Sequence, residues 1–301
     1  YVTTDEARDV IPQLPEMYDE PFSDSSQIPT FLVSQLARQH VTVALSGDGG
    51  DELFGGYNRY FHLRDRWKQV TRIPCRKLVS KLLAVPGSLS SGRWKDRFLY
   101  RAKLLGMSSA GSLYQNANLH WQPDSNVVLN CEGAGSTYWN QDAWLQTENE
   151  IEEWMWLDSV TYLPDDILTK VDRASMAVSL EVRVPVIDHR VFELAWNLPF
   201  DWKISGDAGK SILQDVLNRY VPRAMFERPK MGFGVPIDEW LRGPLKDWAE
   251  SLLDERRLRD QGLLNPEPIR RKWAEHLSGA TDWHYHLWDV LMLQAWLDGQ
   301  A

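Results

Sequence analysis

Apolar positions recur at helical spacing along most of the chain, which predicts a mainly helical protein. The predicted helical ranges, with proline and glycine breaks in the longer ones, are 5–18, 30–39, 57–118, 149–163, 164–180, 191–197, 210–220 and 239–297. The last range contains tryptophans that we expect to fill the gaps between packed helices, namely Trp240, Trp248, Trp273, Trp283, Trp288 and Trp296.

One segment, residues 41–45, departs from the helical pattern. It is short, apolar and rich in β-branched residues, which is typical of a buried strand of a parallel sheet. A single strand leaves its own backbone unpaired. We therefore expect either further short strands in the chain or the rest of the sheet upstream of Tyr1. The predicted fold class is mainly α with a remnant of a parallel α/β sheet, in one domain over residues 1–301.

Charge and composition narrow the possible partners. The chain has 33 Lys and Arg against 42 Asp and Glu, a net charge of -9, which argues against a nucleic-acid surface. No apolar run approaches the roughly 20 residues of a membrane helix. Cys75 and Cys131 lack the spacing of a metal or redox motif, so we expect thiols in a reducing compartment. These features predict a cytoplasmic protein without a nucleic-acid or membrane partner.

A glycine-rich turn, Ser46 to Gly50, follows the predicted strand. Ligands of open α/β sheets bind beyond the carboxyl ends of the strands, and glycines there let backbone amides approach a phosphate. Asp48, Asp51 and Glu52 would repel that phosphate unless a divalent cation lay between them. Mg²⁺ prefers one or two carboxylates together with phosphate oxygens. The pattern therefore indicates a nucleotide and Mg²⁺ site, with a solvated turn as the alternative.

The stretch from Leu45 to Tyr57 resembles the second nucleotide-binding signature of the asparagine synthetases, amide ligases of the PP-loop ATP pyrophosphatase type. Other segments resemble that family in the same order along the chain, namely Asp19–Phe22 with Ile28–Thr30, Asp165–Leu168 with Asp172–Met176 and Glu181–Asp188, and Arg228–Phe233. Together these segments extend the resemblance over nearly the whole chain.

The resemblance implies a reaction in two steps. The side-chain carboxylate of aspartate attacks the α-phosphate of ATP, which gives β-aspartyl-AMP and pyrophosphate, and ammonia then displaces AMP. In full-length relatives the ammonia comes from an N-terminal glutaminase domain. The family pattern places Leu45, Ser46 and Gly47 at ATP, Asp51 at Mg²⁺ and Asp48 at the acyl-adenylate. The best-known members have glutamate at position 48, so the shorter Asp48 leaves its role open.

The resemblance also assigns a catalytic role to Lys230, between Arg228-Pro229 and Gly232. Adenylation develops negative charge on the α-phosphate, and an ammonium positioned there stabilises the transition state. The alternative is a surface lysine in a flexible loop. Arg228 either adds charge at the pyrophosphate or anchors the loop.

The central segment contains charged residues with two possible roles. Asp172 and Arg173 either bind substrate or pyrophosphate or belong to the structure, and Asp166 lies in the same run. Glu181 and Arg183 are expected to form a buried ion pair, with a site role as the alternative. Lys210, in Gly209-Lys210-Ser211, resembles the end of a Walker A loop. Because the first glycine and a preceding strand are missing, we interpret that match as accidental.

Two features of the family are not found in this sequence. The upstream Ser-Gly-Gly-x-Asp-Ser pyrophosphate loop is absent, and so is the glutaminase domain, so we expect the chain alone to be inactive or nearly so. Two other functions remain open: amidation of another carboxylate, such as a sugar acid or a β-lactam precursor, and a non-catalytic domain that binds a partner. A homodimer is compatible with either.

Overall fold

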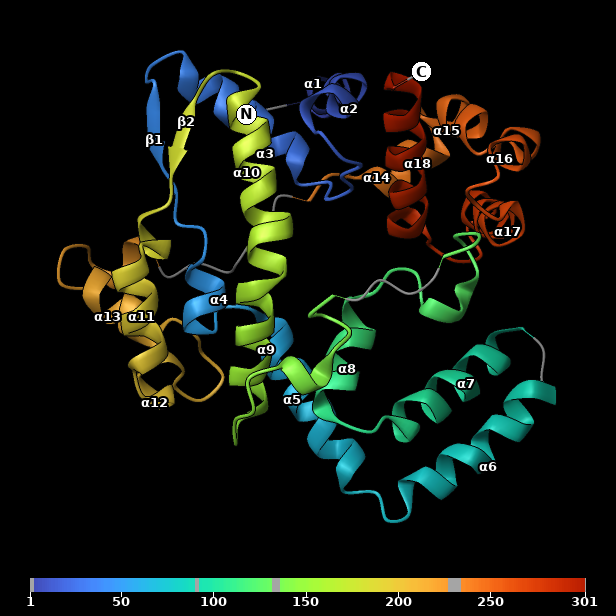
Figure 1. Cartoon of the computed structure of the whole chain (residues 1–301), viewed down its shortest axis with the longest axis horizontal. Helices are drawn as coiled ribbons and strands as arrows, with labels where there is room; N and C mark the ends of the chain where they lie inside the picture. The colour runs from blue at the N-terminus through green and yellow to red at the C-terminus, as the bar shows by residue number, and fades with distance from the viewer. Residues whose placement is uncertain (1–2, 90–91, 132–135, 227–233, 301) are drawn as a thin grey trace.

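The computed structural model describes residues 3–89, 92–131, 136–226 and 234–300, and within them the chain is mostly helical with one small sheet (Figure 1). The first half contains α1 (Thr4–Arg8), α2 (Leu14–Met17), α3 (Gln27–Arg38), β1 (Val43–Leu45), α4 (Gly50–Phe54), α5 (Asn58–Thr71), α6 (Arg76–Leu89), α7 (Gly92–Gly106) and α8 (Ala110–Asn118). The second half contains α9 (Glu150–Val160), α10 (Thr169–Met176), β2 (Glu181–Arg183), α11 (His189–Asn197), α12 (Phe200–Lys203), α13 (Ser211–Leu217), α14 (Ile237–Arg242), α15 (Lys246–Leu252), α16 (Glu255–Gln261), α17 (Pro266–Leu277) and α18 (His284–Gly299).

The sheet has two parallel strands in the described part of the chain. Val43 pairs with Glu181 and Leu45 with Arg183. The prediction of a parallel strand at this position is confirmed, but the prediction that it is buried is wrong. Val43 is 39% and Leu45 73% exposed, so the face of the sheet that carries them is open among the described residues. The strand β2 was not predicted, because it contains the charged residues Glu181 and Arg183 and lacks the apolar pattern of a buried strand.

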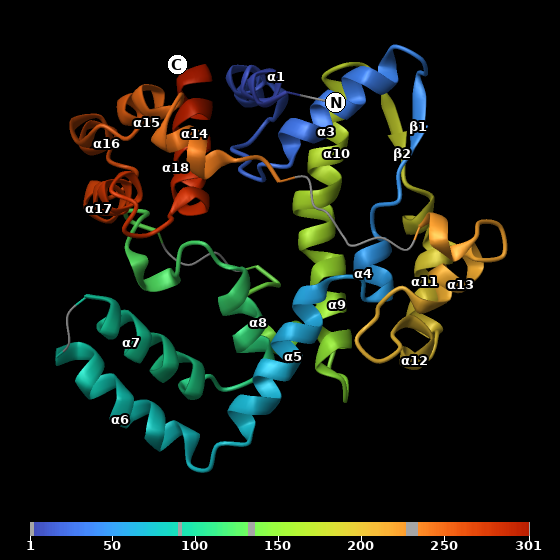
Figure 2. The same ribbon diagram turned by 180° about the vertical axis from the view of Figure 1, so that it is seen from behind.

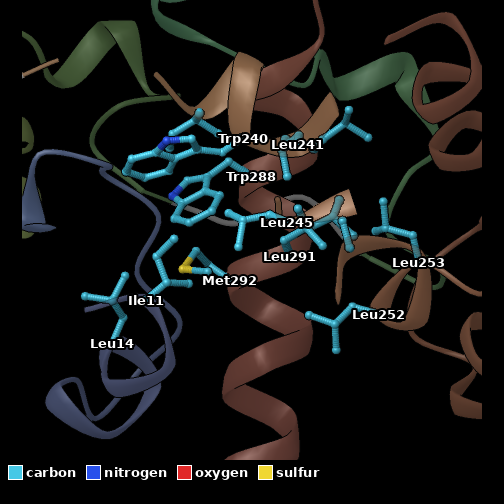
Figure 3. Close-up of a cluster of buried hydrophobic side chains, with 14 of the residues drawn as sticks. Ile11, Leu14, Trp240, Leu241, Leu245, Leu252, Leu253, Trp288, Leu291 and Met292 are labelled. Atoms are coloured by element: carbon cyan, nitrogen blue, oxygen red, sulfur yellow. The ribbon is translucent and has the colours of Figure 1, made fainter. Parts of the chain in front are cut away.

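The largest core lies between the C-terminal helices α14–α18 and the N-terminal segment with α1, α2 and α3. Trp240, Trp273 and Trp288 are buried in it, as predicted from the tryptophan-rich tail, and Trp248 and Trp283 pack against it half-buried. Figure 3 shows the indoles of Trp240 and Trp288 above Met292 and Ile11. The N-terminal segment is thus fixed to the end of the chain by apolar contacts.

A second core joins α5, α8 and α9 around Tyr60, Tyr114 and Trp154, which are all buried. The rings of Tyr114 and Trp154 stack with their centroids 5.1 Å apart. From this core, α9 continues into α10 through a turn of π-helix, Leu163–Leu168, which contains Pro164. Proline cannot donate the regular helical hydrogen bond, and π-helical turns often mark functional sites.

The helices α6 and α7 form an antiparallel pair at the end of the molecule far from the sheet (Figure 2). Cys75, just before α6, and Cys131 are both exposed and are not joined by a disulfide, as the sequence predicts. Within the described ranges, each helix is too short or too polar to cross a membrane.

Candidate active site

The turn after β1 is shaped by side-chain hydrogen bonds and by glycine. The backbone N–H of Ser46 donates to the carbonyl of Arg183 at 2.9 Å, which extends the pairing of the strands by one residue. The Ser46 hydroxyl donates to Oδ2 of Asp48. Gly49 is in the left-handed region, with φ of 82°, and α4 begins at the next residue. The structure thus brings Ser46 and Asp48 together beyond the carboxyl end of β1, where the sequence predicted a ligand-binding turn.

Asp51 lies in the first turn of α4 and contacts a residue that the sequence interpretation set aside. Nζ of Lys210 is 2.8 Å from Oδ2 of Asp51, and both side chains are about a quarter exposed, at 27% and 28%. The Gly209-Lys210 dipeptide resembles a different phosphate-binding motif, and nothing in the local sequence indicates the contact with Asp51. The match of Lys210 to that motif remains interpreted as accidental. The structure nevertheless places Lys210 beside the turn, through its contact with Asp51.

Glu52, the next residue, points away from the turn. It is 1% exposed, and the Tyr57 hydroxyl donates to its Oε1 at 2.5 Å. Burial raises the pKa of Glu52, while the hydrogen bond from Tyr57 opposes that rise. The grouping of Glu52 with Asp48 and Asp51 as carboxylates facing a phosphate is therefore wrong. Successive residues of a helix point about 100° apart, and α4 buries the face that carries Glu52.

A network of polar groups leads from Tyr57 into the second core. The Arg59 guanidinium lies between two tyrosine rings, 4.0 Å from the centroid of Tyr57 and 4.8 Å from that of Tyr162. Its Nη2 donates to Oδ2 of Asp158 at 2.6 Å. The hydroxyls of two further tyrosines, Tyr60 and Tyr114, donate to the same oxygen. Neither Arg59 nor Asp158 was predicted from the sequence. The signal for Arg59 was a basic residue among aromatic residues after Gly55-Gly56.

A cavity of about 870 Å³ lies beside this network. It is lined by the loop of residues 21–26 before α3, by the end of α8, by α9 and the π-helical turn, and by Tyr285 of α18. Arg59 and Asp158 face it, which connects it to the turn through Tyr57 and Glu52. Gly234, the first described residue after residues 227–233, lines the same cavity.

Two carboxyl groups of the cavity wall, those of Asp24 and Asp166, differ in their partners. Lys170 Nζ contacts Oδ2 of Asp24 at 2.5 Å, and it donates to the Ser26 hydroxyl at 2.8 Å. Burial alone would raise the pKa of Asp24, but the ion pair with Lys170 holds it below its usual value. Burial, followed by the charge of Asp24, raises the pKa of Asp166 to about 7. The buried Oδ1 of Asp166 has no hydrogen-bond partner, so it can accept a bond from a ligand.

The side chains of the other predicted residues form ion pairs outside the turn. Arg173 contacts Asp19 at 2.6 Å and Asp172 at 3.8 Å, in an exposed position that ties α10 to the N-terminal segment. Arg183 contacts Glu181 at 2.7 Å; the predicted ion pair exists, but its two side chains are 65% and 54% exposed, so the prediction of burial is wrong. The open sheet explains this exposure.

Two predictions cannot be placed. Lys230 and Arg228 lie in residues 227–233, outside the described residues, so their roles stay predictions.

The whole chain matches a single family model. Residues 1–298 match the model described as asparagine synthase. The chain belongs to the asparagine synthase family. Among its relatives, the glutamine-hydrolyzing asparagine synthetase 1 of Bacillus subtilis is 29% identical over 306 residues, which cover 98% of this chain and 46% of the relative.

Two further relatives carry the same name. The glutamine-hydrolyzing asparagine synthetase 3 of Bacillus subtilis is 26% identical over 73% of this chain and 33% of its own length. The glutamine-hydrolyzing asparagine synthetase of Rattus norvegicus is 26% identical over 60% of this chain and 35% of its own length. The chain thus spans about half the length of the first of these relatives, and its matches to the other two cover about a third of their lengths.

The carboxylates of the turn suit a cation that arrives with a nucleotide. Within the described ranges, no group of three or more His, Cys, Asp or Glu side chains could hold a metal ion by itself. Mg²⁺ is commonly held by one or two carboxylates and by phosphate oxygens. A single carboxylate, Asp51, at the junction of turn and helix fits that ligand set in a family member.

Proposed function

We propose that this chain carries the synthetase site of an ATP-dependent amide ligase, which converts aspartate into asparagine through β-aspartyl-AMP. The observation that carries the proposal is the turn Ser46–Gly50 at the carboxyl end of a parallel strand, with Asp51 in the helix that follows, in a chain that matches the asparagine synthase model over residues 1–298. The position of the turn supports a nucleotide site of the PP-loop type.

Each residue of the turn has a proposed task. Leu45, Ser46 and Gly47 contact ATP, and Gly47 suits this because a side chain added there would meet open space. Asp51 holds the Mg²⁺ that neutralises phosphate charge. Asp48, held by the Ser46 hydroxyl, accepts the proton that ammonia loses when its nitrogen bonds to the acyl carbon and AMP leaves.

Formation of the acyl-adenylate is assigned to positioning and charge. An oxygen of the acceptor carboxylate forms a bond to the α-phosphorus, and the bond to pyrophosphate breaks. Lys230 stabilises the charge that develops on the α-phosphate, and Arg228 assists at the pyrophosphate. Asp172 and Arg173 contribute indirectly by fixing the N-terminal segment, which forms one wall of the cavity.

The cavity is the proposed site of the acceptor. Its wall contains Asp24, Asp158, Asp165 and Asp166. Carboxyl groups accept hydrogen bonds, so this wall favours an acceptor that offers an amino group or hydroxyls besides the carboxylate to be activated. The amino group of aspartate meets this requirement, and so do the hydroxyls of a sugar acid, which keeps another carboxylate as the second candidate.

A screen of acceptors tests the proposal. The protein, with its natural flanking sequence, would be incubated with ATP, Mg²⁺, ammonia and single carboxylates, and pyrophosphate release would be measured. We expect aspartate to support continuous release of pyrophosphate only when ammonia is present. The rate of that release should fall more than tenfold in Asp48→Asn. Release with a sugar acid and not with aspartate would identify the second candidate. No release with any acceptor would favour a non-catalytic domain.

A further inference from the structure

The ion pair between Lys210 and Asp51 is held by the backbone as well as by charge. Lys210 has φ of 62°, in the left-handed region that residues other than glycine rarely adopt. Its backbone N–H donates to the carbonyl of Phe54 at 2.7 Å, at the end of the helix that carries Asp51. The chain therefore accepts an unfavourable conformation at position 210, and the result is an ammonium fixed 2.8 Å from Asp51.

Two glycines, Gly56 and Gly209, make this approach possible. A methyl group on Gly56 would lie 2.2 Å from Oδ1 of Asp51 and 2.3 Å from Cε of Lys210. A methyl group on Gly209 would lie 1.9 Å from the carbonyl oxygen of Gly55. The second glycine pair of the motif, Gly55-Gly56, thus serves the contact between α4 and the segment before α13, in addition to the turn itself.

An ammonium and a divalent cation compete for one carboxylate. Asp51 Oδ2 already accepts the Lys210 ammonium, and a cation on the same carboxylate would lie beside a like charge in a partly buried place. Phosphate oxygens relieve the conflict, because they bind the cation and also accept charge-assisted bonds from lysine. The two positive charges are compatible only when the anionic ligand is present.

We propose that Lys210 is a positioning residue that occupies Asp51 until the nucleotide arrives, and that its ammonium then transfers to phosphate oxygens while the divalent cation takes the carboxylate. This exchange rests on one part of the proposed function, namely that Asp51 binds the divalent cation. It makes cation binding conditional on the nucleotide, so that Asp51 is not filled by a free divalent cation.

A purely structural clamp is the competing explanation. In that case the ion pair would only hold the Gly55-Gly56 segment, and loss of Lys210 would lower the melting temperature without changing the affinity for ATP. The exchange predicts two changes in binding, a higher affinity for a divalent cation without nucleotide and a lower affinity for ATP. Removal of the ammonium takes away a positive charge that opposes a cation at Asp51, so a divalent cation should bind more tightly in the absence of nucleotide.

The test uses Mn²⁺ as the probe, counted by the electron paramagnetic resonance signal of the free ion, without nucleotide. In the protein with its natural flanking sequence, Lys210→Met should lower the dissociation constant for Mn²⁺ at least tenfold. The double variant Asp51→Asn/Lys210→Met should lose that gain. Lys103→Met is the matched control, because it removes the same charge from an exposed lysine that bonds only a neutral partner, Gln122, among the contacts described, and it should change nothing.

A second measurement tests whether the Lys210 ammonium binds the phosphates of the nucleotide. Binding of ATP in the presence of EDTA, by calorimetry, should weaken at least fivefold in Lys210→Met, because the ammonium is then missing from the phosphates. If Lys210→Met does not fold, as judged by circular dichroism, Lys210→Gln replaces it, with the same expected gain in Mn²⁺ affinity.

Unchanged or weaker Mn²⁺ binding in the neutral variant would overturn the exchange. It would also be overturned by a gain that survives Asp51→Asn, or by ATP binding that is unchanged in the neutral variant. The outcomes separate the two proposals. A gain that requires Asp51, in a protein that never releases pyrophosphate, would leave the exchange standing and refute the proposed function.

Discussion

The hydroxyl of Tyr57 donates a hydrogen bond of 2.5 Å to the buried carboxyl of Glu52, and this bond joins the turn after β1 to the aromatic network around Arg59. Tyr57 is therefore a structural link between the turn and the cavity. The motif that suggested a phosphate site also contains the residues that hold that site against the second core.

Tyr57→Phe should destabilise the protein by about 1–3 kcal/mol, the usual effect of leaving a buried polar group without its partner. Burial already raises the pKa of Glu52, and loss of the Tyr57 bond should raise it further. A carboxyl with a raised pKa in the folded state loses stability as the pH rises through that pKa. Urea unfolding should thus show a larger deficit at pH 8 than at pH 5.

The control for this prediction is Tyr220→Phe, since Tyr220 is 81% exposed and should tolerate the change at both pH values. Equal stability of Tyr57→Phe and the parent protein at pH 8 would show that the bond to Glu52 contributes nothing.

Gly209→Ala should destabilise the protein by about 1–3 kcal/mol or more, the range for overpacking a tight contact. The added methyl would meet a backbone oxygen, that of Gly55, at 1.9 Å, so no side-chain rotation can relieve the clash. Gly299→Ala is the matched control, because the added methyl there meets open space. A melting temperature of Gly209→Ala equal to that of the control would contradict the close packing of the two segments.

Asp166→Asn tests the raised pKa in the cavity wall. Because the pKa of Asp166 is about 7 in the folded protein and 3.8 is its ordinary value, folding favours the protonated form. The stability that this provides is present below about pH 4 and is lost as the pH rises to 7. Asparagine cannot ionise, so the variant should be more stable than the parent protein at pH 8 and closest to it at pH 4.

Thermal unfolding at pH 4, 6 and 8 measures this difference. Asp165→Asn, at an exposed neighbouring carboxyl of the same turn, is the control and should show no such trend. A difference between Asp166→Asn and the parent that does not grow with pH would mean that Asp166 is ionised throughout.

The sequence was sufficient for those parts of the fold that local pattern determines. The tryptophans of the tail mark the largest core, because their size leaves few other places for them. The parallel character of residues 43–45 was also predictable, from β-branched apolar residues followed by a glycine turn. The second strand was not, because Glu181 and Arg183 are charged and lie on an open sheet.

In the site, too, local sequence patterns identified some residues and not others. Ser46, Asp48 and Asp51 are adjacent in sequence, so their motif located them. Lys210 reaches Asp51 from a segment 159 residues further along the chain, and no local pattern records that contact. The direction of Glu52 depends on which face of α4 is buried, which is a property of the packed structure.

Lys230→Ala should abolish pyrophosphate release while the Michaelis constants for ATP and aspartate stay within a few-fold. An ammonium that meets charge only in the transition state raises the turnover rate and does not tighten substrate binding. Lys230→Arg should restore little activity, because a planar guanidinium does not replace a point charge. A rise in the Michaelis constant for ATP alone would make Lys230 a residue that binds the ground state.

The central claim is that an acceptor carboxylate is activated as an acyl-adenylate, and transfer of isotope tests it most directly. The protein with its natural flanking sequence would react with ATP, Mg²⁺, ammonia and aspartate labelled with ¹⁸O in its side-chain carboxylate, and the products would be analysed by mass spectrometry. Attack of that carboxylate on the α-phosphorus predicts one ¹⁸O atom in AMP and none in pyrophosphate. Label in inorganic phosphate, accompanied by ADP, would contradict the account.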